Sequence, residues 1–455
     1  MDFVEVCRRL NSGPTVSEKD FDLQVVFPKM RETIQKYKIK YDPQNPVPSD
    51  DALADRVFEA AVDFFSQVGV FCKDTRKIAK FTREEILGSV KGNRPCFGGE
   101  GKDAREWKPR RPDQSDIRVW CHIGAGILAT TEELFLKVVE GYSAIPRADS
   151  MAIPTINKYK DSDIFPGHPL EVMAAIQNVR LARQAMNNVG RPGFPIFNVV
   201  PASGTAQATI AASCPTFGAR PSDGWLVATF PEFKVSYEML SKAAFLNEMK
   251  ANIAGECSAL LGGYAGGPEG VAIASTAYTF FSTLIYGASY HLNFPVTLNE
   301  AISTSREILW AINLNSQAVS RNIRLPYYNS GYTANGPATE NYFYEAAAYI
   351  LSAITCGVTS GTPFPYKGVM ADGITPLECL FHTEVTDAAV KMTRRQANEI
   401  VKKLLEKYEP SLAHPDRGLT YPECFDLRQN KPNDSYAKLY EKVKRELASL
   451  GLKLN

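Results

Sequence analysis

The sequence offers little that points to a metal site. Its nine cysteines and five histidines are scattered singly along 455 residues, with no C-x-x-C pair and no histidine at a metal-ligand spacing. A metal held by the protein itself is therefore not expected. An odd number of unclustered cysteines indicates free, reduced thiols, and on that basis we expect a cytoplasmic protein.

Long apolar runs and an excess of one charge are also missing. No apolar run approaches the roughly 18 residues that a membrane-spanning helix needs, and the N-terminus, MDFVEVCRRLNSG, lacks the pattern of a signal peptide. Basic and acidic residues nearly balance, 51 against 50, for a net charge of +1. This balance provides no field that would attract nucleic acid or anionic lipid, and neither is expected as a partner.

The chain divides into three regions that differ in composition and in hydrophobic pattern. Residues 1–115 are charged and mostly helical in pattern, and they end in a polar stretch, 93–115, that we interpret as a long loop. Apolar spacing over 58–72 and the TREEI motif that begins at Thr82 predict helices there. The tail, 376–455, contains charged amphipathic helices that we expect to pack on the central region or on a neighbouring subunit.

The central region, 116–375, alternates between short apolar runs and helical patterns. The apolar runs predict strands at 117–123, 150–156, 194–200, 224–230, 252–257, 293–298, 323–329 and 355–361. Helices are expected at 131–142, 169–188, 237–250, 271–289 and 305–320. Eight strand–helix units are typical of an α/β TIM (β/α)8 barrel. An open doubly wound sheet gives a similar alternation, but no G-x-G-x-x-G follows the first expected strand, and we expect the barrel.

In a barrel the functional residues gather where strands end. The run FPIFNVV would bring Phe197 to such an end, and NIAGEC isolates one carboxylate, Glu256, among small and apolar residues. A buried carboxylate is costly unless it is paired or protonated, so Glu256 meets a cation, forms a salt bridge or stays neutral. The spacing alone fits two interpretations of Glu256 equally well. One is a structural salt bridge to an arginine, and the other is a functional carboxylate.

Aromatic and glycine-rich segments lie near the same expected strand ends. Most aromatic residues belong to a core, but rings beside one carboxylate would also form a pocket for an alkylammonium group; the rings are those of Tyr264, Tyr290, Tyr327, Tyr328 and Tyr332. The stretch LLGGYAGGPEG, 260–270, is either a tight turn or a loop whose backbone approaches a ligand. It lacks the Lys-Ser/Thr of a phosphate-binding loop. His291 is expected to be structural.

Several motifs in series resemble one family. They are GVFCKDTRKIAKFTREEI (69–86), EVMAA and GRPG (within 171–193), GGYAGG (262–267), YHLNFPV (290–296), TSREIL (304–309), NGPATEN (335–341) and YPECFDL (421–427). Together they resemble the monomethylamine methyltransferases of methanogenic metabolism. The resemblance runs in order from near residue 50 to the C-terminus.

This resemblance implies a TIM barrel that passes a methyl group from a methylated amine to the Co(I) of a corrinoid. In the family the corrinoid is carried by a separate small protein, so the resemblance implies a corrinoid protein as partner and no tightly bound cofactor. It also implies a symmetric homo-oligomer, often a hexamer.

The family's site residues carry over by the flanking motifs. Family members that use monomethylamine have pyrrolysine just after GRPG and three further residues, where this sequence has Phe197. The resemblance further implies that Leu226 and Ser330 replace a carboxylate and an amide, while Glu256 and Tyr332 retain a carboxylate and a tyrosine. It thus implies catalytic roles for Glu256 and Tyr332.

Phe197, Leu226, Ser330 and Tyr264 are expected to bind the substrate. Loss of pyrrolysine together with two polar neighbours argues against simple monomethylamine turnover. The leading hypothesis is a pyrrolysine-free methyltransferase acting on a quaternary or otherwise pre-activated methyl donor. An O- or S-methyl donor is the first alternative, and a catalytically silent homologue that binds a corrinoid protein is the second.

Overall fold

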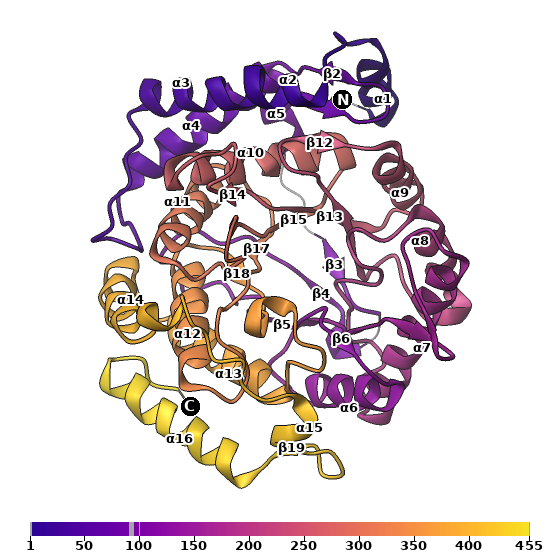
Figure 1. The fold of residues 1–455 in the computed structure, drawn as a ribbon, viewed down its shortest axis with the longest axis vertical. Coiled ribbons are helices and arrows are strands. Elements are labelled where there is room, and N and C mark those ends of the chain that lie inside the picture. Colours follow the sequence, from indigo (N-terminus) through magenta and orange to yellow (C-terminus); the bar gives the residue numbers. More distant parts are fainter. Residues whose placement is uncertain (1, 91–94, 100, 455) are drawn as a thin grey trace.

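A computed structural model describes residues 2–90, 95–99 and 101–454 of the chain. Figure 1 shows short strands in the middle of the molecule with helices arranged around them. The molecule is thus an α/β protein, as expected. Asn93, Arg94 and Glu100 of the predicted loop lie outside the described residues.

Five parallel strands form the main sheet, and they neighbour one another in chain order. They are β11 (Gly224–Ala228), β13 (Asn252–Cys257), β15 (Tyr290–Asn293), β17 (Tyr327–Asn329) and β18 (Thr359–Ser360). A separate parallel pair joins β5 (His122–Gly124) to β7 (Ser150–Ala152). The register places Ala228, Glu256 and Leu292 side by side at the carboxyl ends of β11, β13 and β15.

The prediction of a strand over 194–200 was wrong. Only Ile196 bridges to a neighbouring strand, at Met151. The Phe197 N–H donates to the Met151 carbonyl at 2.8 Å, and the Gly224 N–H donates to the Ile196 carbonyl at 2.7 Å. Pro195 has no N–H to donate, which shortens the ladder that an apolar run would otherwise form. The segment therefore links β7 to β11 through two backbone hydrogen bonds with Met151 and one with Gly224.

The other predicted strands differ mainly in length. The strand over 252–257 has the predicted bounds, whereas those expected at 117–123, 224–230, 323–329 and 355–361 are shorter. The strand expected at 293–298 was misplaced: β15 begins at Tyr290 and ends before Pro295, and a short strand, β16 (Val296–Thr297), follows. The run at 150–156 divides into β7 and β8 (Thr155–Ile156).

The helices that surround the strands begin with polar caps. Ser and Thr side chains accept the hydrogen bond of an early N–H at most of these N-termini, as at Thr131 and Ser236. The helices are α6 (Glu132–Ser143), α7 (Pro169–Asn188), α8 (Ala206–Ala212), α9 (Tyr237–Glu248), α10 (Pro268–Tyr286), α11 (Arg306–Asn322), α12 (Glu340–Thr355) and α13 (Pro376–Ala389). All five predicted helices are confirmed within a few residues, while α8 and α12 were not predicted.

The N-terminal region is joined to the central sheet region. Its elements are α1 (Phe3–Ser12), α2 (Glu18–Asp20), the π-helix η1 (Phe21–Val26), α3 (Phe27–Tyr37), α4 (Asp51–Val68), β1 (Val70–Cys72), β2 (Lys77–Ala79) and α5 (Arg83–Ser89). Strand β1 pairs in parallel with β12 (Lys234–Val235), which follows β11. The predicted helix at Thr82 is confirmed, with a capping box between Thr82 and Glu85.

The C-terminal tail is helical, with α14 (Arg394–Tyr408), the short α15 (Tyr421–Cys424) and α16 (Asp434–Ser449). Figure 1 shows α14 and α16 on the outside, beside α12 and α13. The remaining short elements are β3 (Cys96–Phe97), β4 (Arg105–Glu106), β6 (Leu128–Ala129), β9 (Lys158–Tyr159), β10 (Ser162–Asp163), β14 (Leu260–Leu261), β19 (Phe425–Asp426), β20 (Lys431–Pro432) and the 3-10 turns η2 (Gly101–Asp103), η3 (Pro215–Phe217), η4 (Pro365–Gly368) and η5 (Glu409–Ser411).

The stretch predicted as a plain loop, 93–115, carries part of the core. Strands β3 and β4 pair antiparallel within it, and Phe97 and Trp107 are buried. Both rings contact Phe197, with ring centroids 4.5 and 5.9 Å away. Glycine, proline and charge predict an exposed connection, but two large aromatic side chains give this segment enough apolar surface to be buried inside the molecule.

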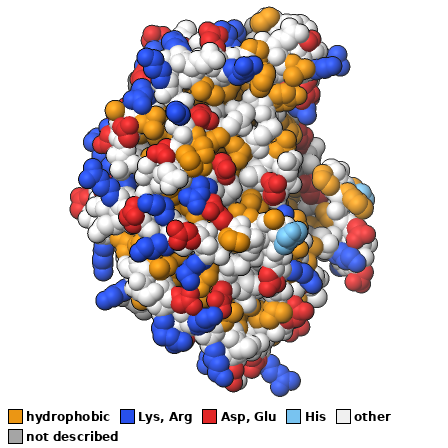
Figure 2. All heavy atoms as spheres, turned by 60° about the vertical axis from the view of Figure 1, so that its left-hand side comes forward, with side chains coloured by type: hydrophobic (Ala, Val, Ile, Leu, Met, Phe, Trp, Pro, Cys, Tyr) orange, Lys and Arg blue, Asp and Glu red, His pale blue; other side chains and the backbone are white. Residues whose placement is uncertain are grey.

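The surface matches the balanced composition. On the face drawn in Figure 2, basic and acidic side chains are interspersed, with hydrophobic side chains between them. Within the described part of the chain, no helix has the length and apolar character needed to cross a membrane.

Candidate functional site

A cavity of about 250 Å³ opens at the carboxyl ends of the central strands. It is smaller than the roughly 300–1,000 Å³ of sites for drug-sized ligands, so it suits a small ligand. Its lining comes from many segments: His122, Gly124, Gly126, Ala152, Thr155, Phe197, Asn198, Pro201, Ala202, Ser203, Leu226, Ala228, Glu256, Leu292, Phe294, Tyr328, Ser330, Tyr332, Gly361 and Phe364.

The structure brings five of the six predicted site residues together. Phe197, Leu226, Glu256, Ser330 and Tyr332 all line this cavity. These residues come from four separate segments, and only the tertiary fold joins them. Their common position is an observation about geometry, and their chemical roles remain predictions.

Tyr264 lies outside the cavity lining. Its side chain is 36% exposed, on the turn after β14. Gly262 and Gly266, which flank it, have φ values of +89° and +76° that favour glycine. The Gly262 N–H donates to the Gly266 carbonyl at 2.9 Å and closes the turn. The GGYAGG motif therefore forms a tight turn, one of the two interpretations its composition allows.

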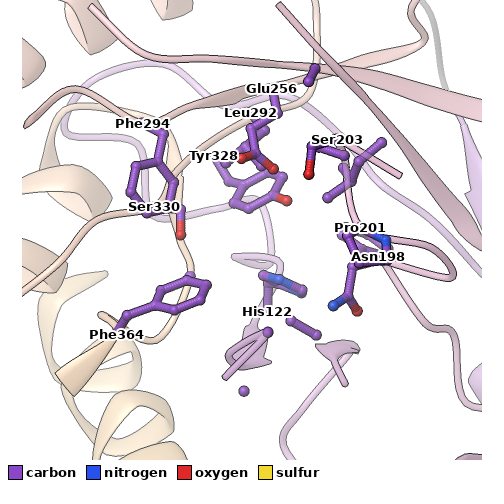
Figure 3. Close-up of a pocket in the computed structure, with 18 of the residues that line it drawn as sticks. His122, Asn198, Pro201, Ser203, Glu256, Leu292, Phe294, Tyr328, Ser330 and Phe364 are labelled. Carbon is purple, nitrogen blue, oxygen red and sulfur yellow. The ribbon is translucent and has the colours of Figure 1, made fainter. Parts of the chain in front are cut away.

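Glu256 is the carboxylate of the cavity. It is the fifth residue of β13, and its side chain borders the cavity (Figure 3). Among the described residues, its carboxylate has no hydrogen-bond partner and forms no ion pair with an arginine. Burial raises the pKa of Glu256 to about 7, while the positive charge of Lys242 opposes that shift. The charged group that acts on Glu256 is therefore a lysine behind the cavity wall.

Three rings on one side of the cavity form an aromatic corner, defined here as Phe294, Tyr332 and Phe364. The centroid distances are 4.7 Å from Phe294 to Tyr332, 5.7 Å from Phe294 to Phe364 and 5.6 Å from Tyr332 to Phe364. The ring planes meet at 68–80°. Edge-to-face packing of this kind is favourable in itself, and it leaves ring surface available to a cation.

Phe197 belongs to both the cavity wall and the core. Its side chain is fully buried and stacks on His122, with the ring centroids 4.8 Å apart. It also contacts Phe97 and Tyr290, at 4.5 and 5.2 Å between centroids. The ring therefore closes the floor of the cavity against a cluster of other aromatic side chains.

His122 is a cavity residue that sequence reasoning missed. Its Nδ1 lies 2.9 Å from the Ser150 hydroxyl oxygen, which also accepts a hydrogen bond from the Trp120 indole N–H at 2.8 Å. Burial lowers the pKa of His122 to about 3, so the ring is neutral. With the Ser150 O–H donating to Nδ1, the ring proton is assigned to Nε2. Its position near the end of the first predicted strand was the available signal.

Asn198, Ser203, Phe294 and Phe364 were also missed. The Asn198 side chain binds the backbone of Ile153: its Oδ1 accepts from the Ile153 N–H at 2.7 Å and its Nδ2 donates to the Ile153 carbonyl at 2.9 Å. Figure 3 shows Asn198 and Ser203 on the side of the cavity opposite Phe294 and Phe364. The cavity thus has one aromatic wall and one polar wall.

Of the other aromatic and histidine residues considered from the sequence, Tyr328 lines the cavity, whereas His291, Tyr290 and Tyr327 lie outside its lining. His291 is fully buried, its Nδ1 lies 2.8 Å from the Ser282 hydroxyl, and it lies outside the cavity lining. The Tyr327 hydroxyl donates to Asn315 at 2.6 Å, and Tyr290 packs in the aromatic cluster. Within the described residues, no group of three or more His, Cys, Asp or Glu side chains is arranged to hold a metal ion.

Replacing Phe197 by Ala is expected to lower the free energy of unfolding by about 3–5 kcal/mol, because the change opens a void among tightly packed rings. Chemical denaturation followed by tryptophan fluorescence would measure it. The control is Phe165→Ala, a ring that is 60% exposed; it should change stability by less than about 0.5 kcal/mol. Equal losses in the two variants would contradict this account of Phe197.

Comparison with known proteins gives consistent matches. The family model for monomethylamine methyltransferase MtmB matches residues 1–452. Monomethylamine methyltransferase MtmB2 of Methanosarcina acetivorans is 28% identical over 449 residues, which is 98% of this chain and 96% of the relative. MtmB1 of Methanosarcina barkeri is 28% identical over 447 residues, with the same coverage. The crystal structure of Methanosarcina barkeri MtmB matches with a TM-score of 0.94 and 27% identity, over 99% of this chain and 98% of that one.

Proposed function

Because the chain belongs to the monomethylamine methyltransferase family MtmB, we propose that it transfers a methyl group from a methylated amine to the Co(I) corrinoid of a separate protein, and that it does so without pyrrolysine. The donor is quaternary or otherwise pre-activated. The observation that carries this proposal is a single cavity in which Phe197, Glu256 and the aromatic corner face a common space.

A phenyl ring cannot capture an amine covalently. Phe197 has no electrophilic atom, so the donor must already carry a nitrogen that leaves easily. In a quaternary ammonium, the methyl carbon–nitrogen bond breaks and its electron pair stays on nitrogen, which departs as a neutral tertiary amine. The partner's corrinoid supplies the nucleophile that accepts the methyl group. No proton has to be delivered to the leaving group.

The chain's residues would bind and orient such a donor. The faces of Phe294, Tyr332 and Phe364 attract a cationic methylammonium group, and each ring contributes about 0.5–2 kcal/mol when water is excluded. Glu256 supplies a negative charge on the same cavity. Leu226 and Phe197 add apolar surface that matches the methyl groups. Ser330 lies beside them on the lining.

An O- or S-methyl donor is the second candidate. Its leaving group develops negative charge and needs an acid, for which Glu256 in its protonated form or Tyr332 is available on the cavity. The pKa of Glu256, raised to about 7 by burial, favours this candidate. A rate that requires a protonated acid would support it over the quaternary amine.

Fold and assembly complete the proposal. We infer that the five-stranded sheet, the β5–β7 pair and the segment at Ile196 make up one (β/α)8 barrel. One hydrogen bond supports closure of the barrel between its last and first strands. The Thr359 hydroxyl, on β18, donates to the Trp120 carbonyl, just before β5, at 3.2 Å. A homo-oligomer and a cytoplasmic location are expected from the family resemblance and the free thiols.

The test is a panel of methyl donors supplied with a Co(I) corrinoid protein while methyl-Co(III) formation is followed by absorbance. Quaternary ammonium donors are expected to be active, and monomethylamine inactive. Monomethylamine as the sole active donor would overturn the proposal. Transfer from no donor, with a corrinoid protein still bound, would identify a catalytically silent homologue.

Phe364→Leu is expected to weaken binding of tetramethylammonium about three- to thirty-fold, because one ring face is lost while apolar bulk is kept. Isothermal titration calorimetry would measure the change. As a matched control, the binding of choline is compared with that of 3,3-dimethylbutanol, an uncharged ligand of similar shape. If both lose affinity equally, the ring acts through shape and the cation interaction is absent.

A further inference from the structure

Lys242, on α9, is buried behind the polar wall of the cavity, with 1% of its surface exposed. Its Nζ donates to the carbonyl oxygens of Pro201, Ala202 and Gly204 at 2.9, 3.1 and 3.2 Å. An ammonium group has three N–H donors, whereas a neutral amine has two. Burial lowers the pKa of Lys242 to about 7, but three carbonyl acceptors require the protonated form in this arrangement.

The carbonyls that Lys242 binds belong to a wall of the site. Pro201, Ala202 and Ser203 line the cavity, and Figure 3 shows Pro201 and Ser203 across the cavity from Phe294. This segment is neither helix nor strand. Apart from Lys242, its carbonyls receive the N–H groups of Gly204 and Ala228, at 2.9 and 3.1 Å. The ammonium group thus joins three carbonyls of this short irregular segment to α9.

No carboxylate contacts Lys242 among the described residues, so its charge must be balanced at longer range. Three acidic groups favour its charged form, Glu256 most strongly, then Glu171 and Glu238. Glu171 already accepts hydrogen bonds from Thr205, and Glu238 accepts one from the Ala206 N–H. A buried cation without a counter-charge is strongly unfavourable. The cavity carboxylate is therefore the main counter-charge of the buried lysine.

We propose that Lys242 is a positioning residue of this site, which anchors the 201–204 wall and favours the ionised form of the cavity carboxylate. The inference rests on the proposed function and deepens it. An ionised Glu256 attracts a cationic donor, whereas an O- or S-methyl donor requires a proton on that acid. The lysine thereby selects for the cationic class of substrate without touching it.

Tetramethylammonium binding, measured by calorimetry between pH 6 and 9, tests the charge role. In the wild type, affinity falls as pH drops through the pKa of Glu256, because the carboxylate becomes neutral. Lys242→Met removes a charge that favours the carboxylate, so the midpoint moves up by about one pH unit and affinity near neutral pH falls up to about tenfold. Lys242→Arg keeps the charge and leaves the midpoint in place. Lys250→Met, the same change at an exposed position just after α9, is the matched control.

Hydrogen exchange of the 202–208 amides tests the wall role. It should be faster in Lys242→Met than in the wild type and unchanged in Lys250→Met. Lys242→Gln, which keeps two N–H donors without the charge, replaces Lys242→Met if that variant does not fold. An unshifted midpoint overturns the charge role, and unchanged exchange overturns the wall role. A wild type that binds no tetramethylammonium at any pH overturns the proposed function instead.

Discussion

Replacing Glu256 by Gln is expected to lower kcat/KM for a quaternary donor by about 100-fold, the usual cost of removing one member of a desolvated charge interaction. The amide keeps the size of the side chain but has no negative charge to offer the aromatic corner. Steady-state methyl transfer to a Co(I) corrinoid protein measures the effect. Most of the loss should appear in KM if Glu256 acts mainly by binding the cation.

The same substitution has a second expected consequence. Without Glu256, the buried ammonium of Lys242 loses its main counter-charge, so the free energy of unfolding should fall by about 3 kcal/mol. The double variant Lys242→Met, Glu256→Gln should recover part of that loss, because neither charge is then left alone. The sign of this coupling distinguishes a charge interaction from two independent packing defects.

Glu300→Gln is the control for both measurements, since Glu300 lies exposed beyond β16. It should alter neither kinetics nor stability. If Glu256→Gln left every activity unchanged, Glu256 would have no part in turnover and the silent homologue would gain support.

Replacing Asp223 by Ala is expected to lower the free energy of unfolding by about 3–5 kcal/mol, because it leaves a buried arginine without its carboxylate. Asp223 is fully buried. It accepts hydrogen bonds from the Arg183 guanidinium at 2.5 Å and from the N–H groups of Arg220 and Ile196 at 2.8 and 3.0 Å. Arg183 in turn donates to the Phe194 carbonyl at 2.7 Å. Together they hold Phe194 and Ile196, on the N-terminal side of Phe197.

Urea unfolding followed by tryptophan fluorescence measures this loss. Asp223→Asn keeps an acceptor for one N–H and should cost less than Asp223→Ala. Asp163→Ala, at an exposed position on β10, should cost less than about 0.5 kcal/mol. A loss below about 1 kcal/mol in Asp223→Ala would contradict the assigned role, because it would show that Arg183 can lose its carboxylate partner at little cost in stability.

Most helices could be predicted from the sequence because their evidence is local. Apolar spacing and a polar cap both lie within one segment, as at Thr131 before α6. Strands were less well placed, because a strand extends only as far as a neighbour offers hydrogen bonds. The apolar run 194–200 has the composition of a strand, yet Pro195 and the position of its neighbours limit it to a single bridge.

The site residues also divide into those that the sequence could predict and those that it could not. Phe197, Leu226, Glu256, Ser330 and Tyr332 could be grouped because ordered motifs flank them, and they do share one cavity. Phe294 and Phe364 could not, since an isolated phenylalanine looks the same in a core and in a cavity wall. Lys242 was equally hidden: a lysine in a helix is normally exposed, and nothing near it in sequence indicates the three carbonyls that it binds.

The sequence by itself determined the composition of this protein, most of its helices, its family resemblance and the identity of the side chain at 197. Only the tertiary structure decided that a glycine- and proline-rich stretch brings Phe97 and Trp107 into the interior, and that Tyr264 turns away from the cavity. It also decided that Lys242 is the charged group that acts on the pKa of Glu256. The reason is physical: periodicity and capping depend on neighbours in sequence, whereas burial, ring packing and charge balance depend on neighbours in space.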